Sequence, residues 1–125
     1  MIDIEKNTLP LDLSYLSDMS GDSAEFMIEM IDMFKQQTPL YITDLEQAIA
    51  SKDWSKAAGF AHKIKPTFSY VGREDARDLV QLIENNARDE KDLSEMPKIL
   101  KDLTDFAAIL YSQLDIARAE LEKKL

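Results

Sequence analysis

Apolar side chains recur along most of this chain at the spacing of a buried helix face, and the clearest case lies in residues 54–72. An α-helix turns about 100° per residue, so apolar residues three and four positions apart form one stripe. The pattern predicts a helix that begins near Trp54, has Asp53 as its N-cap and ends at Gly72, because glycine tolerates the left-handed conformation past a helix end. The predicted stripe comprises Ala57, Phe60, Ala61, Ile64, Phe68 and Val71.

The part of the chain before this helix predicts two further helices. Residues 1–10 read as an irregular segment that ends at Pro10, and a short helix then follows up to the break at Ser20-Gly21. Residues 23–51 predict one long helix, with two helices as the alternative, because Pro39 lacks a backbone donor and should kink the helix near Gln37. Its expected start is a capping pair of Asp22 with Glu25, and its apolar positions include Phe26, Met30, Met33, Phe34, Tyr41, Leu45, Ala48 and Ile49.

Two more helices are predicted after Gly72. Glu74 and Asp75 suit the positive N-terminal end of a helix, which would bury an apolar face from Ala76 to Ala87. The charged run 88–92 then reads as a solvated connection without a function. The last helix should start between residues 92 and 94, with Pro97 in its first turn, and its apolar positions are 99, 100, 103, 107, 110, 114, 117 and 121.

Together these elements predict an all-α fold. No segment has the alternating pattern or the turn residues of β-strands. Amphipathic helices with short connections fold most simply as an up-down antiparallel four-helix bundle, and the short N-terminal helix would cap it. We therefore expect residues 1–125 to form a single helical-bundle domain.

Composition and charge restrict the function. The chain has 125 residues, a net charge of −9 and no cysteine, which excludes disulfides and thiolate metal sites. The acidic balance disfavours nucleic acid and anionic membranes as partners, since both need a basic surface. No apolar run approaches the roughly 20 residues of a membrane span, and the N-terminus lacks the features of a signal peptide. We expect a cytoplasmic protein with a protein partner.

The only histidine, His62, is the main candidate for chemistry. It lies roughly 140° from the centre of the apolar stripe of its helix, so it should point to solvent. Pro66, Ser69 and Arg73 would stack beside it as an approach face, and Lys65 would lie on the flank of this column. A lone exposed histidine is most often an ordinary surface residue, so the histidine by itself does not establish a function.

The surrounding residues change this picture. The run His62-x-Ile64-Lys65, followed by Ser69 and Gly72, resembles the signature of histidine-containing phosphotransfer (HPt) domains. The helical layout of the whole chain is also similar to that family. Two positions depart from the pattern, because Pro66 stands where glycine is usual and Phe68 occupies a position that is often small.

The resemblance implies a phosphocarrier of a multistep two-component phosphorelay. His62 would accept a phosphoryl group from the aspartate of one receiver domain and pass it to another, while Lys65 would neutralise the phosphoryl oxygens. The partners would be receiver domains of a hybrid sensor kinase and of a response regulator. The receiver would also hold the Mg²⁺, so this chain, expected to be a monomer, would need no cofactor.

The resemblance also suggests roles for other residues around His62. Ser69 is the small residue of the pattern, and Gly72 closes the helix. Pro66 removes the N–H that would bond to the carbonyl of His62, which predicts a local bend or a lengthened turn. Glu84, on the next helix, lies where some relatives place a polar residue that bonds the histidine.

The sequence disfavours two other functions and leaves a third as the alternative. A kinase is disfavoured, because the three glycines Gly21, Gly59 and Gly72 are far apart and form no phosphate loop. A di-metal enzyme in a bundle core needs inward Glu-x-x-His pairs, which one outward histidine cannot supply. A helical adaptor that binds a partner through its acidic surface without chemistry remains the alternative.

Overall fold

A computed structural model describes residues 1–125, and every regular element in it is helical. The all-α fold predicted from the sequence is therefore confirmed. The elements in chain order are η1 (Ile4–Thr8), α1 (Ser14–Ser20), α2 (Ala24–Ala50), α3 (Trp54–Tyr70), α4 (Glu74–Asp89), η2 (Leu93–Glu95) and α5 (Met96–Glu122).

Three details of these elements differ from the sequence prediction, and the structure decides one alternative that the sequence left open. The first ten residues are not wholly irregular, because Asp3 caps the 3-10 helix η1. Helix α2 starts after Ser23, whose hydroxyl accepts from the backbone N–H of Phe26, so the expected Asp22 cap is wrong. Helix α2 is continuous through Pro39, which excludes the alternative of two helices. The charged run 88–92 is only partly a connection, since α4 includes its first two residues.

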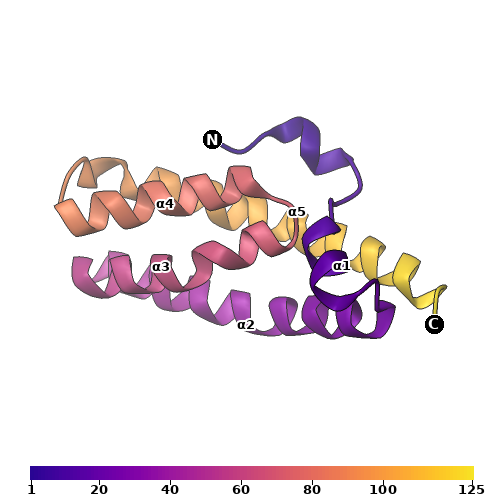
Figure 1. The fold of residues 1–125 in the computed structure, drawn as a ribbon. Helices are drawn as coiled ribbons and strands as arrows, with labels where there is room; N and C mark the ends of the chain where they lie inside the picture. The colour runs from indigo at the N-terminus through magenta and orange to yellow at the C-terminus, as the bar shows by residue number, and fades with distance from the viewer.

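The four long helices form an antiparallel bundle (Figure 1). Going round the bundle, α2 packs on α3, α3 on α4, α4 on α5, and α5 on α2. The ends of α2 and α5 extend beyond the α3–α4 pair, and α1 packs there on α2 and on α3 (Figure 1). The predicted up-down four-helix bundle with a short N-terminal capping helix is thus confirmed.

Three aromatic rings from different helices meet in the core. The ring centroid of Phe68 on α3 lies 5.8 Å from that of Phe34 on α2 and 6.1 Å from that of Phe106 on α5. The predicted stripe of α3 is buried except for Phe60, which is partly exposed. Of the positions predicted on α2, Phe34, Leu45, Ala48 and Ile49 are buried, whereas Phe26, Met30 and Tyr41 are partly exposed and Met33 is half exposed. One contiguous core therefore fixes the orientation of α3, and with it the outward direction of His62.

A tight turn after α3 sets where α4 begins. The backbone N–H of Gly72 donates to the carbonyl of Ser69, and that of Arg73 donates to the carbonyl of Phe68, the pattern of a Schellman motif. Gly72 has φ +78°, and a Cβ added to it would lie 2.1 Å from the carbonyl oxygen of Asp12. Glycine is required here both for the backbone conformation and for the close passage of the N-terminal segment. The prediction that Gly72 closes the helix is confirmed.

Arg73 is buried and joins the N-terminal segment to the bundle. Its guanidinium donates to Asp75 at 2.7 and 3.0 Å, to Gln113 Oε1 at 2.9 Å and to Asn7 Oδ1 at 2.9 Å. It also donates to the carbonyl oxygen of Asp3 and lies 4.6 Å from the centre of the Phe106 ring. We call Arg73 with Asp75, Asn7 and Gln113 the Arg73 cluster.

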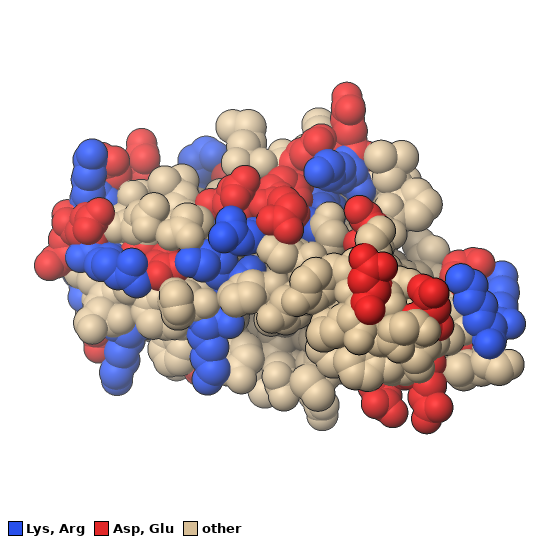
Figure 2. Space-filling view, in the orientation of Figure 1, with Lys and Arg blue, Asp and Glu red and all other residues tan.

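Charged side chains are distributed unevenly over the surface. Basic and acidic side chains alternate along α3 and α4, whereas the region over α1 shows acidic ones (Figure 2). None of the helices is both long and apolar enough to cross a bilayer.

Candidate functional site

His62 lies on the outer face of α3 and is bonded to α4. Its side chain is 69% exposed, which confirms the predicted direction. Its Nδ1 lies 3.0 Å from Oε2 of Glu84, whose own side chain is only 2% exposed. The predicted partner of the histidine is therefore in contact with it. One ring nitrogen faces the protein, and the other, Nε2, is left on the exposed side of the ring.

Glu84 contacts three basic side chains at once. Oε1 accepts from Lys65 Nζ at 2.8 Å, and Oε2 accepts from Arg88 at 2.5 Å in addition to its contact with His62. Lys65 also donates to Gln81 Oε1 at 2.7 Å, and its side chain is only 14% exposed. We call Glu84 with His62, Lys65, Arg88 and Gln81 the Glu84 cluster.

The charge of Glu84 follows from these contacts. Burial alone would raise the pKa of Glu84, but hydrogen bonds from Lys65, Arg88 and His62 outweigh it and hold the pKa below its ordinary value. The side chain is therefore a carboxylate at neutral pH. Since an ionised carboxylate only accepts hydrogen bonds, Nδ1 of His62 must be the donor of this pair. In the neutral ring the proton then lies on Nδ1, and Nε2 carries a free lone pair.

The geometry of α4 explains why these groups meet. Residues 81, 84, 85 and 88 are spaced by three and four positions, so their side chains share one face of the helix. That face lies beside α3, at the level of His62 and Lys65. The opposite face of α4 carries the apolar residues that face the core, and the predicted face is buried at Ala76, Leu79, Val80, Ile83 and Ala87. Polar and apolar stripes on one helix thus serve the site and the fold separately.

The cluster has a charge imbalance that favours an anion. Glu84 contributes one negative charge, whereas Lys65 and Arg88 contribute two positive charges. A phosphoryl group carries close to two negative charges near neutral pH. The unmodified site therefore has one positive charge in excess beside an available nitrogen nucleophile.

The structure distributes the predicted site residues over two different places. Pro66 is exposed and Ser69 is partly exposed on the outer side of α3, on the same side as His62. Arg73 does not extend this approach face, and the prediction is wrong, because the Schellman turn at Gly72 ends the helical register before residue 73. The effect of Pro66 on the backbone at His62 stays a prediction.

The sequence reasoning missed Gln81 and Arg88. Arg88 was assigned to a solvated connection, although its position four residues after Glu84 is the usual spacing of a helical ion pair. The polar spacing of 81, 84 and 88 was therefore a usable signal. What the sequence did not show is that this face of α4 lies against Lys65.

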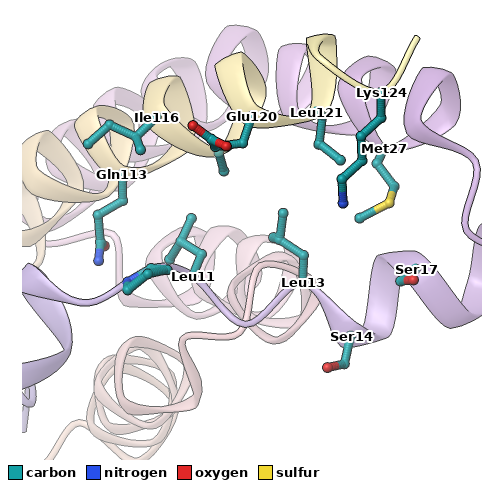
Figure 3. A pocket seen from close by; sticks show the side chains of 12 residues that line it. Leu11, Leu13, Ser14, Ser17, Met27, Gln113, Ile116, Glu120, Leu121 and Lys124 are labelled. Carbon is teal, nitrogen blue, oxygen red and sulfur yellow. The ribbon is translucent and has the colours of Figure 1, made fainter.

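The largest surface pocket lies elsewhere. It has a volume of about 670 Å³ and is lined by residues of the 10–13 segment, α1, α2 and α5 and by Lys124, with none from α3 or α4. Figure 3 shows Leu11 and Leu13 on one side of it and Ile116 and Glu120 of α5 on the other. No group of three or more acidic, histidine or cysteine side chains is arranged to hold a metal ion. None of the residues of the Glu84 cluster lines this pocket.

Known proteins resemble this chain in sequence and in fold. The family model for the Hpt domain matches residues 29–121. The chain is 29% identical over 106 residues to the phosphorelay intermediate protein rdeA of Dictyostelium discoideum, a match that covers 82% of this chain and 42% of that protein. The crystal structure of histidine-containing phosphotransfer protein B from Pseudomonas aeruginosa superposes with a TM-score of 0.65 at 19% identity, over 94% of this chain and 95% of that one, which supports the fold. Because the family match spans more than half of its length, the chain belongs to the Hpt domain family.

Proposed function

We propose that this protein is a phosphocarrier of a multistep phosphorelay, which accepts a phosphoryl group on Nε2 of His62 and passes it on. The observation that carries the proposal is the exposed imidazole whose Nδ1 is held 3.0 Å from a buried carboxylate. The family membership of the chain and its similarity to a phosphorelay intermediate support the same function.

The proposed transfer needs no proton to move. The lone pair on Nε2 attacks the phosphorus of an aspartyl phosphate, a new N–P bond forms, and the P–O bond breaks with its electron pair on the aspartate carboxylate. The ring keeps its proton on Nδ1 and becomes cationic, and the carboxylate of Glu84 lies against that proton to stabilise the charge. Donation to a second aspartate is the reverse of this step.

Lys65 and Arg88 would stabilise the transferring group. Transfer of a phosphoryl group depends mainly on in-line positioning and on neutralising its equatorial oxygens. Lys65 is held one turn from His62, and the Arg88 side chain, which is 57% exposed, bonds the same carboxylate oxygen as the imidazole. On the approach side, the small Ser69 and the compact Pro66 leave room for a partner to reach Nε2.

The partner best suited to this site is a receiver domain. We propose that receivers of a hybrid sensor kinase and of a response regulator supply the aspartates, and that Mg²⁺ is held by the receiver. The exposed position of His62 favours this arrangement, because the nitrogen has to enter the active site of another protein. This chain would then act as carrier without a kinase activity of its own.

Phosphotransfer from a labelled receiver domain tests the proposal. Wild type and His62→Gln are mixed with a phosphorylated receiver, and label on this chain is assayed for its stability in acid and base. We expect acid-labile, base-stable label on wild type and none on His62→Gln. Absence of label on wild type from several receivers, with both proteins folded, would contradict the carrier function and favour the adaptor alternative.

A further inference from the structure

We propose that Gln81 is a positioning residue that aims the ammonium group of Lys65 at the phosphoryl group, an inference that rests on the proposed function. Lys65 Nζ donates to Oε1 of Gln81 at 2.7 Å and to Oε1 of Glu84 at 2.8 Å. Both acceptors belong to α4, whereas Lys65 belongs to α3. The contacts therefore fix the end of a long flexible side chain from a neighbouring helix.

The contacts with Gln81 and Glu84 occupy two of the three N–H donors of Lys65. A lysine ammonium has three N–H donors in a tetrahedral arrangement. Two of them are directed to Gln81 and Glu84, and these two bonds also fix the direction of the third. With one acceptor alone, the ammonium could rotate about that bond and its remaining donors would have no set direction. Gln81 thus converts a loosely placed cation into an oriented donor.

The amide of Gln81 is itself oriented. Its Nε2 donates to Oδ1 of Asn85, one turn further along α4, at 2.8 Å. With the nitrogen engaged there, the oxygen faces Lys65. A reversed amide would place a donor against the ammonium and an acceptor against the Asn85 oxygen, so the two contacts enforce one orientation.

A neutral acceptor suits this position better than a charged one. Glu84 already supplies the negative charge that compensates Lys65 in the unmodified protein. A second carboxylate at position 81 would cancel the positive excess of the Glu84 cluster and compete with the phosphoryl oxygens for the ammonium. The glutamine holds Lys65 by geometry and leaves its charge available.

The test compares Gln81→Leu with wild type in transfer from a phosphorylated receiver domain over a range of receiver concentrations. Leucine removes the acceptor but keeps the size and helix preference of the side chain. We expect the maximal rate of labelling to fall roughly tenfold, as for loss of about 1.4 kcal/mol of transition-state stabilisation. The receiver concentration at half-maximal rate should not change, because Gln81 acts through Lys65. Gln47→Leu, the same change at an exposed glutamine of α2, is the matched control.

A second pair of variants separates positioning from general disturbance. In a Lys65→Met background, Gln81→Leu should cause no further loss of rate, since the residue it positions is absent. An additional loss in that background would overturn the inference, as would a wild-type maximal rate for Gln81→Leu alone. If wild type itself takes no label, the proposed function fails; if wild type is labelled and Gln81→Leu equals it, only the role of Gln81 fails.

Discussion

Helix α4 carries two clusters built around a buried charge, and their partners differ. The Arg73 cluster lies at the N-terminal end of the helix, and the Glu84 cluster lies about three turns further on. The side chains of Arg73 and Glu84 are each only 2% exposed. Around Arg73 the ionic partner, Asp75, is also buried, at 8% exposure, whereas the partners of Glu84 include Arg88 and His62, which reach the solvent.

The exposure of their partners gives the two clusters different roles. A buried charge whose ionic partner is also buried is closed, and the hydrogen bonds of Arg73 join the N-terminal segment, α4 and α5. A buried charge whose partners extend to the surface anchors those partners without hiding them. The first arrangement should therefore affect stability, and the second should affect the chemistry of His62.

The largest loss of stability is expected when the buried ion pair of the Arg73 cluster is broken. Arg73→Met keeps apolar contact with Phe106 but leaves the Asp75 carboxylate buried without its cation. We expect the free energy of unfolding to fall by about 3–5 kcal/mol, as for other broken buried pairs. Urea unfolding measures this loss. Phosphotransfer to His62, assayed at a temperature where the variant remains folded, should be unchanged, and a parallel loss of transfer would show that the two clusters are not separate.

Removing Lys65, the buried cation of the Glu84 cluster, should reduce phosphotransfer much more than it reduces stability. Lys65→Met deletes the ammonium but keeps much of the side-chain volume. We expect transfer to fall about 100-fold, the scale of losing one charged group that stabilises a transition state. The free energy of unfolding should fall by less than in Arg73→Met, because Arg88 and His62 remain on Glu84. A variant with normal transfer and a large loss of stability would reverse the assignment.

The smallest effect concerns the pH dependence of stability that Asp75 contributes to the Arg73 cluster. Burial would raise the pKa of Asp75, but hydrogen bonds from Arg73 and from the Asp3 backbone N–H lower it below its ordinary value. Because the folded pKa lies below the unfolded one, this stabilisation is complete at neutral pH. It is lost as the pH falls through the unfolded and then the folded pKa.

Asp75→Asn should therefore be less stable than wild type at neutral pH, and its unfolding free energy should fall less steeply in acid. Unfolding curves measured from about pH 7 to pH 3 test this sign. Equal slopes for the two proteins would contradict the role of Asp75. Glu84 has the same direction of shift, so an acid-dependent slope should persist in the variant.

Much of the fold followed from the spacing of apolar residues. The stripes of α3 and α4 and the turn at Gly72 were predicted because each depends on residues close in sequence. Arg73 was misplaced because a helical wheel was extended past the glycine at which the helix ends. The pairing of faces between helices could not be predicted in this way, because the spacing of residues within α4 does not show which face of α3 they contact.

The site shows the same division. The outward direction of His62 is a property of one helix, and it was predicted. The contacts of Lys65 with Gln81 depend on the packing of two helices, and the sequence offered no local signal for them. The 3-10 helix at residues 4–8 was missed for a related reason, since its segment is held by Arg73 from a distant part of the chain.

The most direct test of the account asks which ring nitrogen carries the phosphoryl group. The protein, labelled with ¹⁵N at histidine and phosphorylated by a receiver domain, can be examined by long-range ¹H–¹⁵N and ³¹P NMR, and the single histidine gives one set of signals. With Nδ1 donating to Glu84, the account predicts a phosphoryl group on Nε2 and a retained proton on Nδ1. A phosphoryl group on Nδ1 would contradict it, because that nitrogen could then no longer donate to the buried carboxylate.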